Sequence, residues 1–233
     1  MPLPENRTAL IVGASRGLGL ALANEYLKRD WRVIATVRGS RHTLLHDLAA
    51  ASEGRLQIEM IDINARDDVA NLRQRLDQRH LDLLFVNAGV AIDPDVAIGK
   101  VSTEDFVTVM VTNALSPMRV IEALHALVPP SGTIVAMSSD LGSVSDNVDG
   151  GWEAYRASKA ALNTLMRSFA ARHAGDPRSF LLIAPGWVRT DMGGPEAELS
   201  IEESIPRVVD TVSAQAGVPG LQYLDYQGRI VAW

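Results

Sequence analysis

Short apolar runs alternate with longer amphipathic stretches along the chain, and this alternation limits the possible folds more than any other feature. Seven runs of aliphatic and β-branched residues are expected to be strands: Thr8–Val12, Arg32–Val37, Leu56–Ile61, Leu81–Asn87, Gly132–Met137, Ser179–Ala184 and Leu221–Leu224. The stretches between them have helical spacing: Gly17–Arg29, Arg41–Ala50, Ala65–Arg79, Thr103–Leu127, Tyr155–His173 and Ile201–Ala216. Near-continuous apolar strands imply burial on both faces of the sheet. The pattern therefore predicts an α/β fold, a single Rossmann-type domain over residues 1–233 with a doubly wound parallel sheet of about seven strands.

Two segments do not fit this alternation. Asp140–Glu153 is polar and rich in glycine, and Thr190–Ser200 contains two glycines and a proline. Both follow predicted strand ends, where binding loops lie in sheets of this kind. Ser200 and Glu203 have the spacing of a capping box, which favours a helix start there. We expect a substrate loop near residues 190–206.

The first predicted strand runs directly into Gly13-Ala14-Ser15-Arg16-Gly17-Leu18-Gly19 and then into a helix. Glycines allow the backbone to turn tightly and to approach a pyrophosphate, whose charge suits the N-terminus of a helix. The same glycines could serve only a tight turn, but their place after the first strand favours a dinucleotide site.

Gly13-x-Ser15-x-Gly17 also matches the nucleophile elbow of α/β hydrolases. Such an elbow requires a downstream acid and then a histidine. His173 is the last histidine and falls inside a helical stretch, and elbows usually follow several strands rather than the first. The hydrolase remains a minor alternative.

The end of the second predicted strand bears on the choice of cofactor. An acidic residue there would bind the 2′-hydroxyl of an NAD ribose, but the strand ends in Val37-Arg38. Arg16 could meet Arg38 around a 2′-phosphate, which two guanidinium groups suit well. The pair favours NADP(H), although either arginine alone could be an ordinary surface residue. Asp62 could accept a hydrogen bond from the adenine amino group or could be a turn residue.

Tyr155 and Lys159 are four residues apart in a predicted helix and so share one face. A nearby ammonium group stabilises a tyrosinate and would lower the pKa of Tyr155. Tyr155 is therefore a candidate general acid for a reduction, or a base for the reverse oxidation. The plain alternative is a surface lysine on an amphipathic helix.

These motifs occur in a recognisable order: Gly13-x-x-x-Gly17-x-Gly19, Asn87-Ala88-Gly89, Ser139, Tyr155-x-x-x-Lys159 and Pro185-Gly186. In this order and over nearly the whole chain, the sequence resembles the short-chain dehydrogenase/reductase family. Further runs resemble its C-factor and Sniffer-type carbonyl reductase subgroup: Leu141-Gly142-Ser143, Gly150-Gly151-Trp152, Tyr155-Arg156-Ala157-Ser158-Lys159 and Pro185-Gly186-Trp187-Val188-Arg189-Thr190-Asp191-Met192.

The resemblance implies roles for four catalytic residues. Tyr155 would be the acid/base, and Lys159 would bind the nicotinamide ribose and lower the pKa of Tyr155. Ser139 would hydrogen-bond the substrate carbonyl oxygen, and Asn113 would anchor a water that links Lys159 to solvent. Without the resemblance, Asn113 and Ser139 would be interpreted as a polar residue at a helix kink and a turn residue after a strand.

The resemblance also implies the cofactor contacts. Asn87 and Gly89 would flank the adenosine, and Thr190 would touch the nicotinamide carboxamide. The same site would include Ser15, Leu18, Ala88, Pro185, Gly186 and Val188. Val12 replaces the threonine that the family usually has before the first glycine, which removes a hydroxyl group but not the turn. The spacing from Ser139 to Tyr155 is longer than the usual one, which leaves Ser138 and Ser143 as alternatives to Ser139.

We therefore expect an NADPH-dependent reductase that converts a carbonyl to an alcohol, with Tyr155 as general acid. Trp152, Trp187 and Met192 would line an apolar pocket, which favours a hydrophobic aldehyde, ketone or quinone, although tryptophans near loops also serve packing. An NADP-binding regulatory or signalling protein with incidental turnover is the alternative from another functional class. The family resemblance implies a homo-oligomer, a dimer or tetramer.

Composition limits the partners. The formal charge of −6 disfavours nucleic acid, and the chain has no continuous apolar stretch of the length of a membrane span. The chain has no cysteine, and its first residues lack the pattern of a secretory signal, so we expect a cytoplasmic protein. His42 and His46 are four apart on a predicted helix but lack a third ligand, so no metal is expected.

Overall fold

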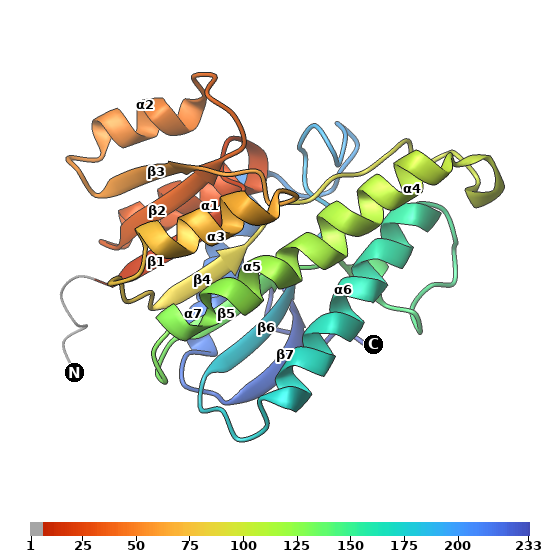
Figure 1. Ribbon diagram of the computed structural model, residues 1–233. Helices are drawn as coiled ribbons and strands as arrows, with labels where there is room; N and C mark the ends of the chain where they lie inside the picture. Colours follow the sequence, from red (N-terminus) through yellow and green to blue (C-terminus); the bar gives the residue numbers. More distant parts are fainter. Residues whose placement is uncertain (1–6) are drawn as a thin grey trace.

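The computed structural model describes residues 7–233 and contains one parallel sheet of seven strands. The first six residues, on which the expectation about a secretory signal depends, lie outside the described residues. The strands lie in the order β3-β2-β1-β4-β5-β6-β7 (Figure 1). Their bounds are β1 (Thr8–Val12), β2 (Arg32–Val37), β3 (Leu56–Met60), β4 (Leu83–Val86), β5 (Thr133–Met137), β6 (Ser179–Ala184) and β7 (Gly220–Asp225). The predicted doubly wound sheet is confirmed.

The sheet changes direction of growth at β1. The chain first builds β1, β2 and β3 outward, and then crosses back to place β4 on the other side of β1. Ligands of doubly wound sheets bind at such a switch point, beyond the carboxyl ends of the strands. The glycine loop directly follows β1 and lies at this point.

Successive side chains of a strand enter different halves of the core, as the period of two requires. In β1, Ala9 and Ile11 belong to one buried cluster, whereas Leu10 and Val12 belong to the other. The first cluster is completed by α1 (Gly17–Lys28), α2 (Leu44–Ala51) and α7 (Ile201–Ala214). The second is completed by α3 (Arg66–Arg75), α5 (Ser116–Leu124) and α6 (Glu153–Arg172), so helices cover both faces (Figure 1).

The single helix predicted over Thr103–Leu127 is wrong in detail. The chain forms α4 (Thr103–Met110), a π-helical turn η2 (Val111–Leu115), α5, and a 3₁₀ turn η3 (His125–Leu127). A π-turn adds one residue to the helical repeat, and such turns occur frequently at functional sites. Here the turn contains the candidate residue Asn113.

The two irregular segments hold short elements of their own. Asp140–Gly142 forms the 3₁₀ turn η4, as Ile98–Lys100 forms η1 after β4. The capping box at Ser200 is present, because its Oγ accepts from the Glu203 N–H at 3.1 Å and the Glu203 carboxylate accepts from the Ser200 N–H at 2.7 Å. Helix α7 therefore begins at Ile201, and residues 201–206 of the expected substrate loop are helical.

In residues 7–233, we find no helix with the length and hydrophobicity that crossing a membrane requires.

Candidate active site

The glycine loop has a backbone path that side chains would block. Gly13 has φ +86°, and a Cβ atom on it would lie 2.7 Å from the Cβ of Ala88. A Cβ atom on Gly19 would lie 2.0 Å from the Gly13 carbonyl oxygen. Contacts this short do not occur, so the loop can pass against α1 and the end of β4 only with glycine at both positions.

Neighbouring strands support this loop. The N–H of Gly13 donates to the Thr36 hydroxyl of β2 at 2.9 Å, and the N–H of Ala14 donates to the Thr36 carbonyl at 2.8 Å. Asn87 donates its side-chain amide to the Gly13 carbonyl at 2.8 Å. Thr36 was missed by the sequence analysis, and its hydroxyl supports the turn although Val12 lacks one.

The N-terminus of α1 suits an anion. Over the described residues, no side chain caps this helix, and its first turn contains no acidic residue. Unsatisfied N–H groups at a helix N-terminus attract phosphate. The absence of side chains on Gly13, Gly17 and Gly19 leaves room for a bulky diphosphate, so the residues present fit a dinucleotide.

The Arg16 guanidinium, expected near a 2′-phosphate, contacts the Asp191 carboxylate at 2.7 Å, and both side chains are exposed. Arg38 follows β2 and is also exposed. Asp62 accepts from the N–H of Asn64 at 2.9 Å and thus supports a turn after β3.

Tyr155 and Ser139 come together at the carboxyl edge of the sheet. Ser138 and Ser139 directly follow the end of β5, and Tyr155 lies in the first turn of α6. Burial raises the pKa of Tyr155 to about 12, although a hydrogen bond with the Ser139 side chain lowers it. The phenol is therefore protonated at neutral pH, the form that a general acid requires.

Lys159 is buried one turn further along α6. Its Nζ donates to the Met137 carbonyl at 2.9 Å and lies 5.6 Å from the centroid of the Tyr155 ring. Burial lowers the pKa of Lys159 to about 8. The expectation that Lys159 brings the pKa of Tyr155 below its usual value is wrong for this arrangement, because desolvation of the phenol dominates.

Asn113 and Lys159 converge on Gly89. A Cβ atom on Gly89 would lie 3.4 Å from Asn113 Oδ1 and 3.6 Å from Lys159 Nζ. The Asn113 amide accepts from the Val90 N–H at 2.8 Å and donates to the Val90 carbonyl at 2.7 Å. It also donates to the Ser158 hydroxyl at 3.0 Å, so the π-turn is tied both to the loop after β4 and to α6.

The three candidate serines have different surroundings. The buried Ser138 donates to Asn163 at 2.6 Å, and the buried Ser143 accepts from the Asp146 N–H at 3.1 Å. Among these three, Ser139 is the one whose side chain lowers the pKa of Tyr155.

The segment after β6 lies near the glycine loop and is internally braced. The Gly17 position faces the Thr190 methyl group, which would lie 3.9 Å from a Cβ atom there. Val188 is buried and forms a bridge with Leu199, and the Pro185 carbonyl accepts from Ser204 of α7 at 2.7 Å. Gly186 has φ +79°, where a side chain would also clash with Leu199.

The remaining predicted cofactor residues border the same edge. Ser15 and Leu18 are half-buried beside the first turn of α1. Ala88 donates its N–H to the Val12 carbonyl at 3.0 Å, which fixes the end of β4 beside the glycine loop. These residues follow the carboxyl ends of β1 and β4, and Arg38 and Asp62 follow those of β2 and β3.

A shallow hollow beside Tyr155 has a mixed lining. The loop after β4 contributes Ile92, Asp93, Pro94 and Val96, and the start of α6 contributes Trp152, Glu153 and Ala154. Trp152 has φ +52° and its ring meets Tyr155 edge-on at 5.7 Å between centroids. Trp187 is exposed and donates to the Gly193 carbonyl at 2.8 Å. Trp187 and Met192 thus belong to the segment after β6, whereas Trp152 belongs to the start of α6.

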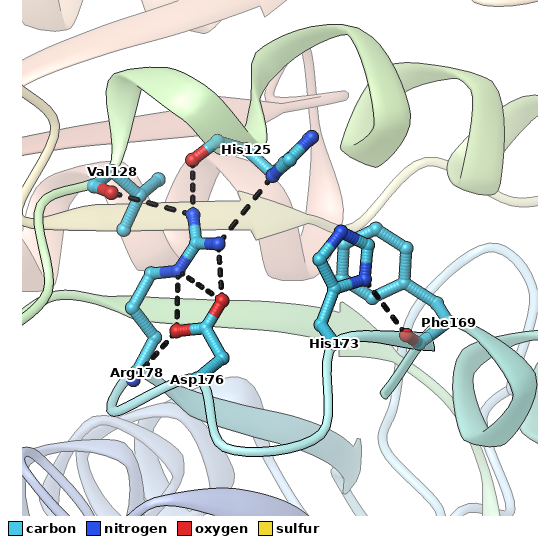
Figure 2. Close-up of polar contacts among 6 residues, drawn as sticks. All are labelled: His125, Val128, Phe169, His173, Asp176 and Arg178. Atoms are coloured by element: carbon cyan, nitrogen blue, oxygen red, sulfur yellow. Dashed lines mark hydrogen bonds and ion pairs between the residues drawn. The ribbon is translucent and has the colours of Figure 1, made fainter. Parts of the chain in front are cut away.

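The hydrolase alternative fails on geometry. Ser15 lies beyond the carboxyl end of β1, whereas His173 follows the last turn of α6, at the opposite edge of the sheet. There its ring packs against the ring of His125, near the Asp176–Arg178 ion pair (Figure 2). His173 donates to or accepts from no hydroxyl in this group and contacts the Phe169 carbonyl at 2.9 Å.

Comparison with known proteins agrees with this geometry. The chain matches the family model for short chain dehydrogenase over residues 7–199. A crystal structure from Burkholderia multivorans with bound NADP is 58% identical, with a TM-score of 0.96 and coverage of 97% of this chain and 99% of that chain. The carbonyl reductase Sniffer of D. melanogaster is 30% identical, with a TM-score of 0.89 and coverage of 99% and 100%. The C-signal of Myxococcus xanthus is 36% identical over 155 residues, 66% of this chain and 93% of that protein.

The fold and the edge of the sheet define an enzyme of the nucleotide-dependent oxidoreductase class. More narrowly, the chain belongs to the short-chain dehydrogenase/reductase family, as its motifs predict. The NADP in the Burkholderia structure agrees with the cofactor expected from the sequence.

Proposed function

We propose that the chain reduces a carbonyl compound to an alcohol with NADPH, and that Tyr155 is the general acid. The observation that carries this proposal is the placement of Tyr155 in the first turn of α6, with Lys159 buried one turn further along and its Nζ 5.6 Å from the centroid of the Tyr155 ring. The related carbonyl reductase and the related structure with NADP support the same reaction class.

The proposed division of work follows from the positions of the side chains. NADPH, when bound, supplies the hydride to the carbonyl carbon. Ser139 hydrogen-bonds the carbonyl oxygen and orients it toward Tyr155. The Tyr155 hydroxyl donates its proton to this oxygen, which is the step that a phenol with a raised pKa can perform at neutral pH. Lys159 would bind the nicotinamide ribose, and Asn113 would anchor a water that links Lys159 to solvent.

The cofactor residues follow the same edge. The first turn of α1 and the glycine loop would bind the diphosphate, and Asn87, Ala88 and Gly89 would border the adenosine. Arg16 and Arg38 would bind the 2′-phosphate, which requires Arg16 to exchange the Asp191 carboxylate for the phosphate. An exposed ion pair of this kind is worth about 0–1 kcal/mol, so the exchange costs little. Thr190, in a substrate loop of residues 190–200, would reach the carboxamide.

The proposed substrates are hydrophobic aldehydes, ketones and quinones. The Trp152 ring, which meets the Tyr155 ring edge-on, supports an apolar substrate. The test is oxidation of NADPH in the presence of benzaldehyde, acetophenone and menadione by the wild type and Tyr155→Phe. Turnover by the wild type that falls at least about 100-fold in the variant supports the proposal. Equal turnover by both proteins would refute the role of Tyr155.

A regulatory role is a second candidate, and the similarity to the C-signal of Myxococcus xanthus favours it. In that case binding of NADP, rather than turnover, would matter. A phenotype that is lost with Tyr155→Phe supports the enzyme. A phenotype that survives Tyr155→Phe but is lost with Gly19→Asp supports the binding role.

A further inference from the structure

Hydrogen bonds from side chains that have no part in the proposed chemistry fix the turn that contains Ser139. Tyr223 of β7 donates its hydroxyl to the Ser139 carbonyl. Asn163 of α6 donates to the Gly142 carbonyl at 3.2 Å and accepts from the Ser138 hydroxyl at 2.6 Å. Both ends of the turn are therefore attached to buried side chains of neighbouring elements.

The Tyr223 ring that makes this hydrogen bond is buried. The Tyr223 side chain is fully buried, and its ring packs against Trp233 with 5.5 Å between centroids. The Arg167 guanidinium lies 4.7 Å from the centroid of the Trp233 ring. Ser145 donates its N–H to the Trp233 carbonyl at 3.1 Å. A hydrogen bond that is partly buried, as this one is, is stronger than one fully exposed to solvent.

The backbone of Ser139 determines where its hydroxyl lies. Ser139 is extended, with φ −165° and ψ 151°, and its Oγ accepts from the Leu141 N–H at 3.2 Å. Rotation of the peptide after Ser139 would move this Oγ relative to Tyr155. The Tyr223 hydroxyl binds the carbonyl of that same peptide and so opposes the rotation.

We propose that Tyr223 is a positioning residue, whose hydroxyl acts through the Ser139 carbonyl to keep the Ser139 hydroxyl against Tyr155. This inference rests on the proposed function, because it assigns Tyr223 a part in the same reaction. Tyr223 lies 84 residues after Ser139 and outside the motifs of the site.

The first test is Tyr223→Phe, which keeps the ring against Trp233 and removes only the donor. We expect kcat for the best substrate among benzaldehyde, acetophenone and menadione to fall about tenfold, because displacement of a catalytic group by a fraction of an ångström is costly. The Kd for NADPH should stay unchanged. The matched control is Tyr226→Phe, which should keep full kcat. Within residues 7–233, the Tyr226 hydroxyl accepts only from the Gln227 side chain, at 3.2 Å.

The second test is a double-mutant cycle with Ser139→Ala. If Tyr223 acts through Ser139, Tyr223→Phe costs nothing further once the Ser139 hydroxyl is gone. A second readout is the pH profile of kcat. Loss of the Ser139 hydrogen bond should move the pKa of Tyr155 upward, whereas a smaller folded fraction would lower kcat equally at every pH. If Tyr223→Phe does not fold, Trp233→Ala exposes the same hydrogen bond to water and serves both tests.

The outcomes separate the two proposals. Additive losses in the cycle, or an unchanged kcat in Tyr223→Phe, would overturn the role of Tyr223 while the proposed function stands. Full activity in Tyr155→Phe, or no turnover of any of the three compounds by the wild type, would overturn the proposed function and this inference with it.

Discussion

Gly19→Ala should abolish most of the affinity for NADPH while leaving the fold intact. The new Cβ atom would lie 2.0 Å from the Gly13 carbonyl oxygen, 2.7 Å from Asn87 Nδ2 and 3.0 Å from Ala14 Cα. Since Cβ atoms essentially never approach closer than 3.0 Å, the glycine loop must move away from α1 by about 1 Å. This movement also strains the hydrogen bond from Asn87 to Gly13.

The magnitude follows from that displacement. A misplacement of about 1 Å can cost on the order of 100-fold, and we expect a loss of this size in the affinity for NADPH. Overpacking of a tight contact costs about 1–3 kcal/mol of stability, which leaves a folded protein at room temperature. Calorimetric titration with NADPH gives the affinity, and urea unfolding gives the stability.

The matched control is Gly99→Ala. A Cβ atom on Gly99 would have no neighbour within 4 Å, and Gly99 lies in η1 rather than in the glycine loop. This variant should bind NADPH with the affinity of the wild type. If Gly19→Ala also binds with wild-type affinity, the glycine loop is not the diphosphate site and the reasoning fails.

Three further predictions concern charge. Arg38→Ala should weaken NADPH binding about tenfold and leave NADH binding unchanged, because only NADPH has a 2′-phosphate that Arg38 would bind with a charge-assisted hydrogen bond. Equal losses of affinity for the two nucleotides would contradict this. Lys159→Met should be more stable than the wild type at pH 7, and this advantage should shrink between pH 8 and 9.5 in urea titrations. The sign follows because the pKa of Lys159 is about 8 when folded and 10.5 when unfolded, so wild-type stability rises with pH in that window; a constant difference would refute it. Arg178→Met should cost about 3–5 kcal/mol, since it leaves the Asp176 carboxylate almost buried without its partner. Arg172→Met, which breaks an exposed ion pair with Glu122, should cost less than about 1 kcal/mol in the same urea assay. Similar costs for the two variants would contradict the stronger effect expected of the less exposed pair.

The sequence was sufficient to predict the sheet and most helices because both faces of the strands are buried. Continuous apolar runs such as Ser179–Ala184 therefore mark strands without ambiguity. The boundaries were less predictable. Helix α6 begins at Glu153, before the predicted Tyr155, because Trp152 adopts a left-handed backbone that no local propensity indicates. The π-turn at Asn113 was also missed, since one inserted residue hardly changes the apolar period of a long helix.

The candidate site was predictable where it consists of local motifs. The glycine loop and the Tyr155–Lys159 pair are each contained in a few residues. The contacts that hold the site span long distances in the sequence instead. Arg16 meets Asp191 across 175 residues, and Tyr223 meets Ser139 across 84. Such partners follow from the order of the strands and from packing, which a single sequence does not specify residue by residue.

The protonation of Tyr155 shows a further limit. The spacing to Lys159 indicated a lowered pKa, but the structure gives a pKa of about 12 because burial outweighs the other contributions. Two residues that share a helix face can still place their polar atoms apart. Here Lys159 directs its ammonium group to the Met137 carbonyl.

Paired titrations of the wild-type protein with NADPH and NADH, followed by quenching of tryptophan fluorescence, test the central claim most directly. The account predicts a Kd for NADPH in the micromolar range and a Kd for NADH at least about tenfold weaker, from the contacts of Arg16 and Arg38 with the 2′-phosphate. Equal affinities would contradict the assignment of the 2′-phosphate site. Failure of both nucleotides to bind, checked by calorimetry, would contradict the proposed reductase itself.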